Sequence, residues 1–145
     1  MAAEQATVVT IPVRSTDMDA DQIVNNAVYF VYFEQARLVH LQRLGVVQRP
    51  RRPGVPARAF TIAATNARYL APTVHPDALE ITVQTAEVRN RSFTLAFQAV
   101  RVSDGVRVVE GSSAQVWLDT AGRPALLPDD VREPLLRSVL PPETS

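Results

Sequence analysis

The spacing of hydrophobic residues changes once along this chain, and the change predicts one long helix after a first strand. Residues 6–14 are rich in Val, Thr and Ile, as expected for a strand. From Ala27 onward, apolar positions recur every three or four residues, which is the period of one helical face. Asn25 or Asn26 suits the N-cap of this helix and Gly45 its stop, so we predict a helix of about five turns whose aromatic stripe packs against a sheet.

Four further segments are predicted to be strands. They follow residues 48–56, which contain three prolines and a glycine and are therefore expected to be a connecting loop. Alternation of apolar and polar residues, clearest in the second and third segments, places the strands at residues 59–70, 79–89, 92–102 and 106–118. Turn-forming residues at 90–91 and 103–105 predict hairpins between neighbours, and hence an antiparallel meander.

A short terminal helix is predicted over residues 128–138, opened by Pro128 and ended by Pro141-Pro142, with residues 141–145 as a flexible tail. The aromatic stripe of the long helix can be buried only if the sheet curls around it. We therefore expect an α+β fold in a single domain spanning residues 1–145, with one long helix wrapped by a curled antiparallel sheet of about five strands.

Composition removes several classes of function. The 145 residues include no Cys, which excludes a cysteine nucleophile and thiolate metal sites, and all 15 basic residues are Arg, which excludes a Schiff-base lysine. The 15 basic and 15 acidic residues balance to a net charge of zero, which argues against nucleic acid and a polybasic membrane anchor. His40 and His75 lack metal-ligand spacing, so no metal site is expected and both are assigned packing or surface roles.

No secretory signal or membrane span is expected. The start Met-Ala-Ala-Glu-Gln has neither a basic segment nor an apolar one, and the longest apolar run, Ala27 to Phe33, is too short to cross a bilayer. We therefore expect a cytoplasmic protein whose partner is a small molecule or another protein subunit.

An acidic segment directly before the long helix is the most informative part of the chain. The pattern is Asp-x-Asp, a turn, an apolar residue, paired Asn, Tyr and then Phe-Glu-x-Ala-Arg, and it falls on Asp17, Asp19, Val24, Asn25, Asn26, Tyr29, Phe33, Glu34, Ala36 and Arg37. It resembles the signature of hotdog-fold acyl-CoA thioesterases of the 4-hydroxybenzoyl-CoA thioesterase type. Residues 66–69, 77–79 and 87–93 also follow the family order. Gln22 departs from it, since many members carry Gly there, and Ile23 stands where many members carry His and others an aliphatic residue.

This resemblance implies an enzyme that hydrolyses an acyl-CoA thioester to a free acid and coenzyme A, without a metal or redox cofactor. It assigns Asp19 as the carboxylate that either attacks the carbonyl carbon or activates a water molecule, two routes that the sequence leaves open. It assigns the backbone N–H of Asn26, at the helix start, as the donor to the developing oxyanion. The acyl group is left open. Residues implied in substrate binding are Tyr29, Asn66, Arg89 and Arg91.

Other interpretations remain for several of these residues. Asp17, Asp19 and Asp21 are each residues that turns favour on local hydrogen-bonding grounds, and Tyr29 is equally suited to core packing. If Asp19 reacts, Asp17 is expected to be a turn residue or to support the site from behind. Glu34 is a rival carboxylate, because some hotdog thioesterases use an acid from the middle of the long helix, but it can instead pair with Arg37.

The arginines have competing roles as well. Arg89 and Arg91 suit coenzyme A phosphates but equally suit a soluble hairpin. Weaker candidates for the same phosphates lie in and after the proline-rich loop: Arg49, Arg51, Arg52 and Arg58.

Two other functions and an assembly state complete the expectations. A non-catalytic acyl-CoA-binding hotdog module would not need Asp19, and a hotdog enoyl hydratase would need an Asp and His arrangement that is not found. A single hotdog leaves a sheet edge unpaired, so we expect a homo-oligomer, a dimer or a homotetramer, with Asp19 from one subunit and Arg89 or Arg91 from another.

Overall fold

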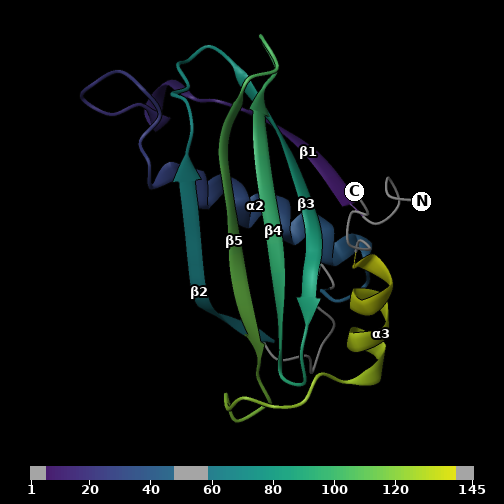
Figure 1. Cartoon of the computed structure of the whole chain (residues 1–145). Coiled ribbons are helices and arrows are strands. Elements are labelled where there is room, and N and C mark those ends of the chain that lie inside the picture. The colour runs from purple at the N-terminus through teal and green to yellow at the C-terminus, as the bar shows by residue number, and fades with distance from the viewer. Residues whose placement is uncertain (1–5, 48–58, 140–145) are drawn as a thin grey trace.

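One antiparallel sheet with a long helix across one face forms the molecule (Figure 1). The computed structural model describes residues 6–47 and 59–139. The elements in chain order are β1 (Ala6–Pro12), the 3₁₀ helix η1 (Ser15–Asp17), α2 (Val28–Arg43), β2 (Phe60–Tyr69), β3 (Ala78–Val88), β4 (Ser92–Arg101), β5 (Arg107–Trp117) and α3 (Asp129–Ser138). The predicted architecture is thus confirmed, and each predicted strand lies within one or two residues of the observed one. The proline-rich loop and the tail beyond residue 139 were predictions for residues outside the described ranges.

The order of the strands corrects one prediction. The sheet runs β1-β3-β4-β5-β2, so only β3, β4 and β5 form a meander, while β2 pairs with β5 at the far edge. Residues 70–77 separate β2 from β3, and they are too many, and include Pro72 and Pro76, for a tight hairpin. Alternation predicts that a segment is a strand, but it does not name the neighbour with which that strand pairs.

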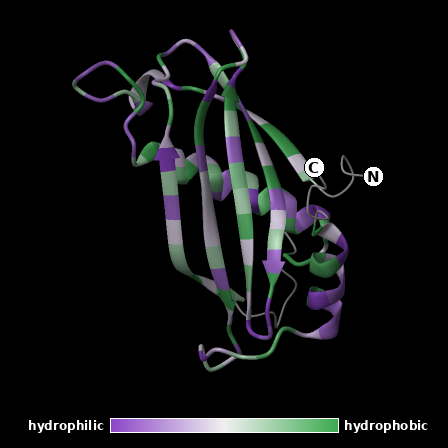
Figure 2. Ribbon diagram, in the orientation of Figure 1, coloured by the Kyte–Doolittle hydropathy of each residue, from purple (hydrophilic) through white to green (hydrophobic). Residues whose placement is uncertain are grey.

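The core lies between the sheet and α2. On this face β3 presents Leu79, Ile81 and Val83 and β4 presents Phe93, Leu95, Phe97 and Ala99, and this alternation with polar residues is visible in the colours of Figure 2. Phe33 of α2 stacks on Phe97 of β4 with ring centroids 4.6 Å apart, so the predicted aromatic stripe does pack against the sheet. Gly111 of β5 lies beside this pair, and a Cβ there would collide with the backbone carbonyl oxygen of Asn66 and lie 3.2 Å from the Phe33 ring. Only glycine therefore allows β2 and the helix to approach so closely.

The start of α2 differs from the prediction. The N-cap is Ala27 and no side chain caps the helix, so the assignment of Asn25 or Asn26 as N-cap is wrong. Asn25 instead supports the turn just before the helix: its Oδ1 accepts the Ala27 N–H at 2.9 Å and its carbonyl accepts the Val28 N–H at 2.9 Å. An Asn side chain readily makes such a local bond, and this moves the first helical residue one or two positions along the chain.

A chain of polar groups crosses the core and joins both helices to the sheet. His40 of α2 is fully buried, with its Nδ1 2.7 Å from Thr7 Oγ1 and its Nε2 3.0 Å from Thr85 Oγ1. The Arg43 Nε–H donates to Thr7 Oγ1, and Thr85 Oγ1 lies 2.6 Å from the Ser138 hydroxyl of α3. This confirms a packing role for His40. The other histidine, His75, is on the surface.

Candidate active site

The acidic segment before α2 folds back on itself as a tight turn. A bridge joins Met18 to Val24, the Asp19 N–H donates to the Ile23 carbonyl at 2.8 Å, and the Asn25 N–H donates to the Asp17 carbonyl at 3.0 Å. Hydrogen bonds on both sides of this turn hold Asp17 and Asp19 directly before the helix start. We call residues 17–25 the acidic turn.

Asp19 is half-buried in the acidic turn, and its side chain makes a local contact. Its Oδ1 accepts the backbone N–H of Asp21 at 2.8 Å, and its carbonyl accepts the N–H of Gln22 at 3.0 Å. Gln22 adopts a left-handed conformation with φ of 63°, which explains why Gly is suited to this position. Asp21 is exposed. The other carboxylate oxygen of Asp19, Oδ2, has no hydrogen-bond partner among the described residues.

The backbone N–H of Asn26 lies at the junction between the acidic turn and α2. No acceptor for it is found among residues 6–47 and 59–139, whereas the N–H groups of Ala27 and Val28 are both bound by Asn25. On the other side of the same residue, the Tyr69 hydroxyl donates to the Asn26 carbonyl at 2.9 Å. A free N–H next to a helix start, on a residue whose carbonyl is held by a side-chain bond, is suited to bind an oxygen that carries negative charge.

Asp17 is buried and anchors the acidic turn. The Tyr32 hydroxyl donates to its Oδ2 at 2.7 Å, the Arg14 backbone N–H donates to the same oxygen at 2.9 Å, and the Arg14 guanidinium donates to Oδ1 at 3.1 Å. Burial by itself would raise the pKa of Asp17, but these hydrogen bonds outweigh it and hold the pKa below its usual value. Burial and the neighbouring carboxylate raise the pKa of Tyr32, so its proton stays in place. Asp17 is thus an ionised group that supports the turn, as expected for it if Asp19 reacts.

Replacement of Tyr32 by Phe tests this anchor. We expect Tyr32→Phe to lower the free energy of unfolding by about 1.5–3 kcal/mol, because a buried carboxylate loses a hydrogen-bond donor. Urea titration followed by circular dichroism measures the loss. Tyr69→Phe is the matched control, since its hydroxyl contacts a neutral carbonyl at the surface and its loss should cost less. Equal losses in the two variants would contradict a special role for the bond to Asp17.

Tyr29 is buried on the inner face of α2, and its hydroxyl donates to Thr73 Oγ1 at 3.1 Å. Its ring lies against Tyr32 and Tyr69, with centroids 5.8 and 5.6 Å away. Burial raises the pKa of Tyr29. Within this chain Tyr29 has the surroundings of a core residue, and its assignment to substrate binding stays a prediction.

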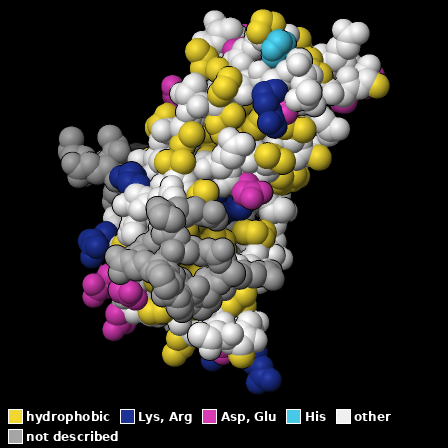
Figure 3. All heavy atoms as spheres, turned by 180° about the vertical axis from the view of Figure 1, so that it is seen from behind, with side chains coloured by type: hydrophobic (Ala, Val, Ile, Leu, Met, Phe, Trp, Pro, Cys, Tyr) yellow, Lys and Arg dark blue, Asp and Glu magenta, His cyan; other side chains and the backbone are white. Residues whose placement is uncertain are grey.

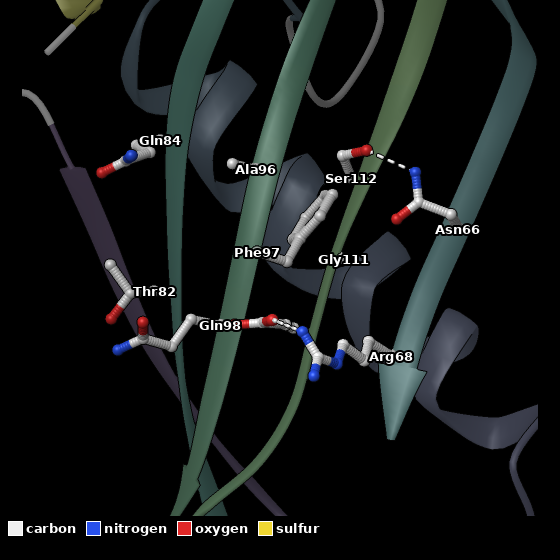
Figure 4. A pocket seen from close by; sticks show the side chains of 10 residues that line it. Asn66, Arg68, Thr82, Gln84, Ala96, Phe97, Gln98, Gly111 and Ser112 are labelled. Atoms are coloured by element: carbon white, nitrogen blue, oxygen red, sulfur yellow. Dashed lines mark hydrogen bonds and ion pairs between the residues drawn. The ribbon is translucent and has the colours of Figure 1, made fainter. Parts of the chain in front are cut away.

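Asn66 lies on the face of the sheet that α2 does not cover. Its Nδ2 donates to Ser112 Oγ at 2.7 Å, and Figure 4 shows both residues in front of the sheet with the helix behind it. They belong to an open recess of about 550 Å³. Most of the other side chains that line it are polar ones from the strands, Arg68, Thr82, Gln84, Gln98 and Glu110, and Ala96 and Phe97 are apolar. The structure does not bring Asn66 together with the acidic turn into one cavity, so its substrate role also stays a prediction.

Arg89 and Arg91 lie at the β3–β4 hairpin, at the end of the sheet opposite the acidic turn (Figure 1). Arg89 is exposed and its Nε donates to Glu87 at 2.8 Å, an ion pair that raises its pKa. Arg91 is exposed too. Within one chain these two residues therefore do not meet Asp19.

Glu34, the rival carboxylate considered from the sequence, lies on α2. It is exposed, and the alternative pair with Arg37 is not found within the described residues. In the part of the chain that the structure describes, no cluster of three His, Cys, Asp or Glu residues could hold a metal ion. No helix there is both long and apolar enough to span a membrane.

Two residues of this region escaped the sequence analysis. Tyr32 and Tyr69 fix the acidic turn and the helix start by hydrogen bonds to Asp17 and Asn26. Tyr32 had a weak signal, because its position three residues after Tyr29 places it on the inner helical face. Tyr69 ends a strand far along the chain, and only the tertiary structure places its hydroxyl at the helix start.

Known proteins resemble this chain over most of its length. The Thioesterase-like superfamily matches residues 13–135. The chain is 30% identical to the long-chain acyl-CoA thioesterase FadM of Escherichia coli, covering 89% of this chain and 96% of FadM. It is 24% identical to the chloroplastic acyl-acyl carrier protein thioesterase ATL3 of Arabidopsis thaliana, covering 86% of this chain but only 64% of ATL3.

A solved structure agrees with the sequence relatives. A thioesterase of Thermus thermophilus, complexed with coenzyme A and Zn, is 29% identical and superimposes with a TM-score of 0.76, covering 90% of this chain and 92% of that one. The predicted resemblance, the hotdog fold and the assignment as a thioester hydrolase are thereby confirmed. The chain belongs to the thioesterase-like superfamily of hotdog-fold enzymes.

Proposed function

We propose that this enzyme hydrolyses acyl-CoA thioesters with Asp19 as the reacting carboxylate and the Asn26 N–H as the oxyanion donor. The observation that carries the proposal is the acidic turn, which holds a half-buried carboxylate directly before a helix start whose Asn26 N–H has no acceptor in residues 6–47 and 59–139. The names of FadM, an acyl-CoA thioesterase, and of a related thioesterase complexed with coenzyme A support the class of substrate.

The chemistry needs two groups on opposite sides of one carbonyl. As the carbonyl carbon is attacked, its oxygen gains negative charge, and the Asn26 N–H would stabilise that charge together with the positive end of the α2 dipole. Asp19 would either attack the carbon, so that coenzyme A leaves and water then hydrolyses the mixed anhydride, or take a proton from the attacking water. Both routes release the acid and the thiol. Tyr69 would help to keep Asn26 in position through its hydrogen bond to the carbonyl of that residue.

The substrate contacts proposed for Arg89 and Arg91 require a second subunit. Both lie at the end of the sheet remote from the acidic turn, so one chain cannot place them on the nucleotide of a thioester bound at Asp19. The edge strand β2 supports such an assembly: among the described strands it pairs with β5 alone, and Ile62 and Tyr69 on it are 39% and 40% exposed. We therefore propose a homo-oligomer, a dimer or a tetramer, with sites between subunits; the cytoplasmic location stays a prediction.

Thiol release from a panel of acyl-CoAs tests the function. The wild-type protein should release coenzyme A from at least one of aromatic, short-chain and long-chain acyl-CoAs. Because the chain has no cysteine, a thiol reagent detects only the product. Binding of acyl-CoA without thiol release across the panel would favour the non-catalytic binding module. A strictly monomeric species by light scattering at micromolar concentration would contradict the shared site.

A further inference from the structure

Thr73, in the segment between β2 and β3, holds the acidic turn from outside. It is fully buried, and its carbonyl accepts the Val24 N–H at 2.9 Å, near the end of that turn. Its Oγ1 accepts the hydroxyl of Tyr29, in the first turn of α2, at 3.1 Å. The two bonds lie on either side of Asn26, two residues before it and three after it. The position of Thr73 therefore helps to set the position of the Asn26 N–H.

Arg101, the last residue of β4, binds the peptide that leads into Thr73. Its Nη1–H donates to the Pro72 carbonyl, and its side chain is 20% exposed. Pro72 has no backbone N–H, so its carbonyl is the one backbone group through which this residue can be held. A hydrogen bond from a charged donor is stronger than one between neutral groups. The guanidinium of Arg101 thus fixes the backbone directly before the residue that holds the acidic turn.

Asp104, in the turn between β4 and β5, orients this guanidinium. The Arg101 Nε–H donates to its Oδ1 at 3.0 Å, and Arg101 Nη2 lies 2.9 Å from its Oδ2. Two parallel bonds fix the plane of a guanidinium, so Nη1 is left directed at the Pro72 carbonyl. Asp104 Oδ1 also accepts the Val106 N–H at 3.1 Å, which ties the carboxylate to the hairpin.

The same hairpin holds the segment between β2 and β3 at a second point. The Ser103 hydroxyl donates to Asp77 Oδ2 at 2.7 Å, just before β3 begins. Figure 3 shows this end of the molecule at the top, from the α2 side, with charged side chains scattered among hydrophobic and uncharged ones. Individual hydrogen bonds rather than a dense cluster of charges therefore hold this region.

We propose that Arg101 is a positioning residue for the hydrolysis, which acts through the Pro72 carbonyl and Thr73. It keeps the acidic turn and the first turn of α2 in the arrangement that places the Asn26 N–H opposite Asp19. The proposal rests on the proposed function, because it takes these two groups as the reacting ones. In the described part of the chain, the side-chain hydrogen bonds of Arg101 go to Pro72 and Asp104 and not to the acidic turn. Its effect on the reaction is therefore indirect.

Thiol release from an acyl-CoA that the wild type hydrolyses gives the first test. Arg101→Gln should lower kcat by about 10–100-fold with KM changed less than about twofold, because slight misplacement of reacting groups slows the chemical step. Arg101→Lys should be faster than Arg101→Gln, since an ammonium can still donate to the Pro72 carbonyl. Arg107→Gln is the matched control: Arg107 is exposed, and its ion pair at 3.6 Å is with Glu110. This variant should keep kcat within about twofold.

Hydrogen exchange followed by NMR gives a second test that needs no substrate. The amide of Val24 donates to the Thr73 carbonyl, so in Arg101→Gln it should exchange about fivefold or more faster, the factor expected for one weakened hydrogen bond. The amide of Leu95, in the centre of the sheet, should keep its rate, which shows that overall stability is unchanged. Both amides should keep their wild-type rates in Arg107→Gln.

Asp104→Asn covers the case in which Arg101→Gln does not fold. An Asn oxygen can still accept the Val106 N–H, but the charge that orients Arg101 is lost. The variant should lose kcat in the same direction by a smaller factor. The double variant of Arg101→Gln with Asp104→Asn should be no slower than Arg101→Gln alone, because the two residues act through one contact.

Three results would overturn the proposal for Arg101. They are a wild-type kcat in Arg101→Gln, an unchanged exchange rate of the Val24 amide, and a loss of kcat accompanied by equally faster exchange of the Leu95 amide. Failure of the proposed function looks different. In that case the wild type releases no thiol from any acyl-CoA, or Asp19→Asn keeps its turnover. A wild type that depends on Asp19 but not on Arg101 contradicts the positioning role alone.

Discussion

Asp19→Asn is expected to lower kcat for acyl-CoA hydrolysis by roughly 10²–10⁴-fold, the range usual for a lost acid–base group. The amide can neither attack the thioester carbonyl nor take a proton from water. The acidic turn should persist, because an Asn oxygen can still accept the Asp21 N–H that Asp19 Oδ1 now accepts. Binding should change little, so the loss should appear in kcat more than in KM.

The measurement is thiol release under saturating substrate, with the fold verified by circular dichroism. Asp21→Asn is the matched control, because it removes the same charge from an exposed residue of the same turn and should retain turnover within about twofold. If the Asp19→Asn variant keeps most of its turnover, Asp19 is only a turn residue. Glu34, the other carboxylate considered from the sequence, would then be the candidate for the reacting group.

The stability of the protein is expected to fall by about 3 kcal/mol between pH 6.5 and pH 4 on account of His40 alone. Burial and the nearby Arg43 lower the pKa of His40 from 6.5 to about 4 in the folded state. Above pH 6.5 the imidazole is neutral in both states and contributes no pH dependence. Below that pH, His40 binds a proton in the unfolded chain but not in the folded one. The free energy of unfolding therefore falls until about pH 4.

The geometry around His40 explains why it stays neutral. Arg43 Nε–H already donates to Thr7 Oγ1, so the Thr7 hydroxyl can donate its own proton to His40 Nδ1 only if that nitrogen carries none. His40 Nε2–H then donates to Thr85 Oγ1. A second proton on the ring would place two donors on Thr7 and leave its hydroxyl proton without this acceptor.

Urea unfolding of the wild type and of His40→Gln at several pH values measures the effect. Gln can replace one donor and one acceptor of the ring but does not titrate, so it serves as the reference. Asp17, whose pKa is lowered, also loses stabilisation in acid, but it does so in both proteins. The stability difference between the two should be constant above about pH 7 and shift by about 3 kcal/mol against the wild type toward pH 4. Parallel curves would contradict the prediction.

Much of the fold followed from local signals. Apolar residues recur at the helical period around Phe33 on α2 and at every second position in β3 and β4. These periods depend only on which face of an element is buried. The hairpin between β4 and β5 followed from turn residues such as Gly105, which has a φ of 71°. These features repeat over short distances, so a single sequence carries them.

The candidate site was only partly predictable, because a single sequence carries short-range signals and only some of the site residues lie close together in the chain. Asp19 and Asn26 lie within one short motif, and the acidic turn is closed by bonds between near neighbours, so sequence and structure agree on where they lie. Asn66, Arg89 and Arg91 come from separate segments of the sheet, and the motif order alone did not reveal that the fold places them away from the acidic turn.

The sequence by itself determined the elements, the zero net charge without Cys or Lys, and the acidic motif before the helix. Only the tertiary structure decided that β2 pairs with β5, that Tyr32 holds Asp17, and that Arg101 binds the Pro72 carbonyl. The physical reason is one of range: periodicity and turns arise from neighbours in the chain, whereas burial, strand partners and side-chain bonds arise from residues that the fold brings together from far apart.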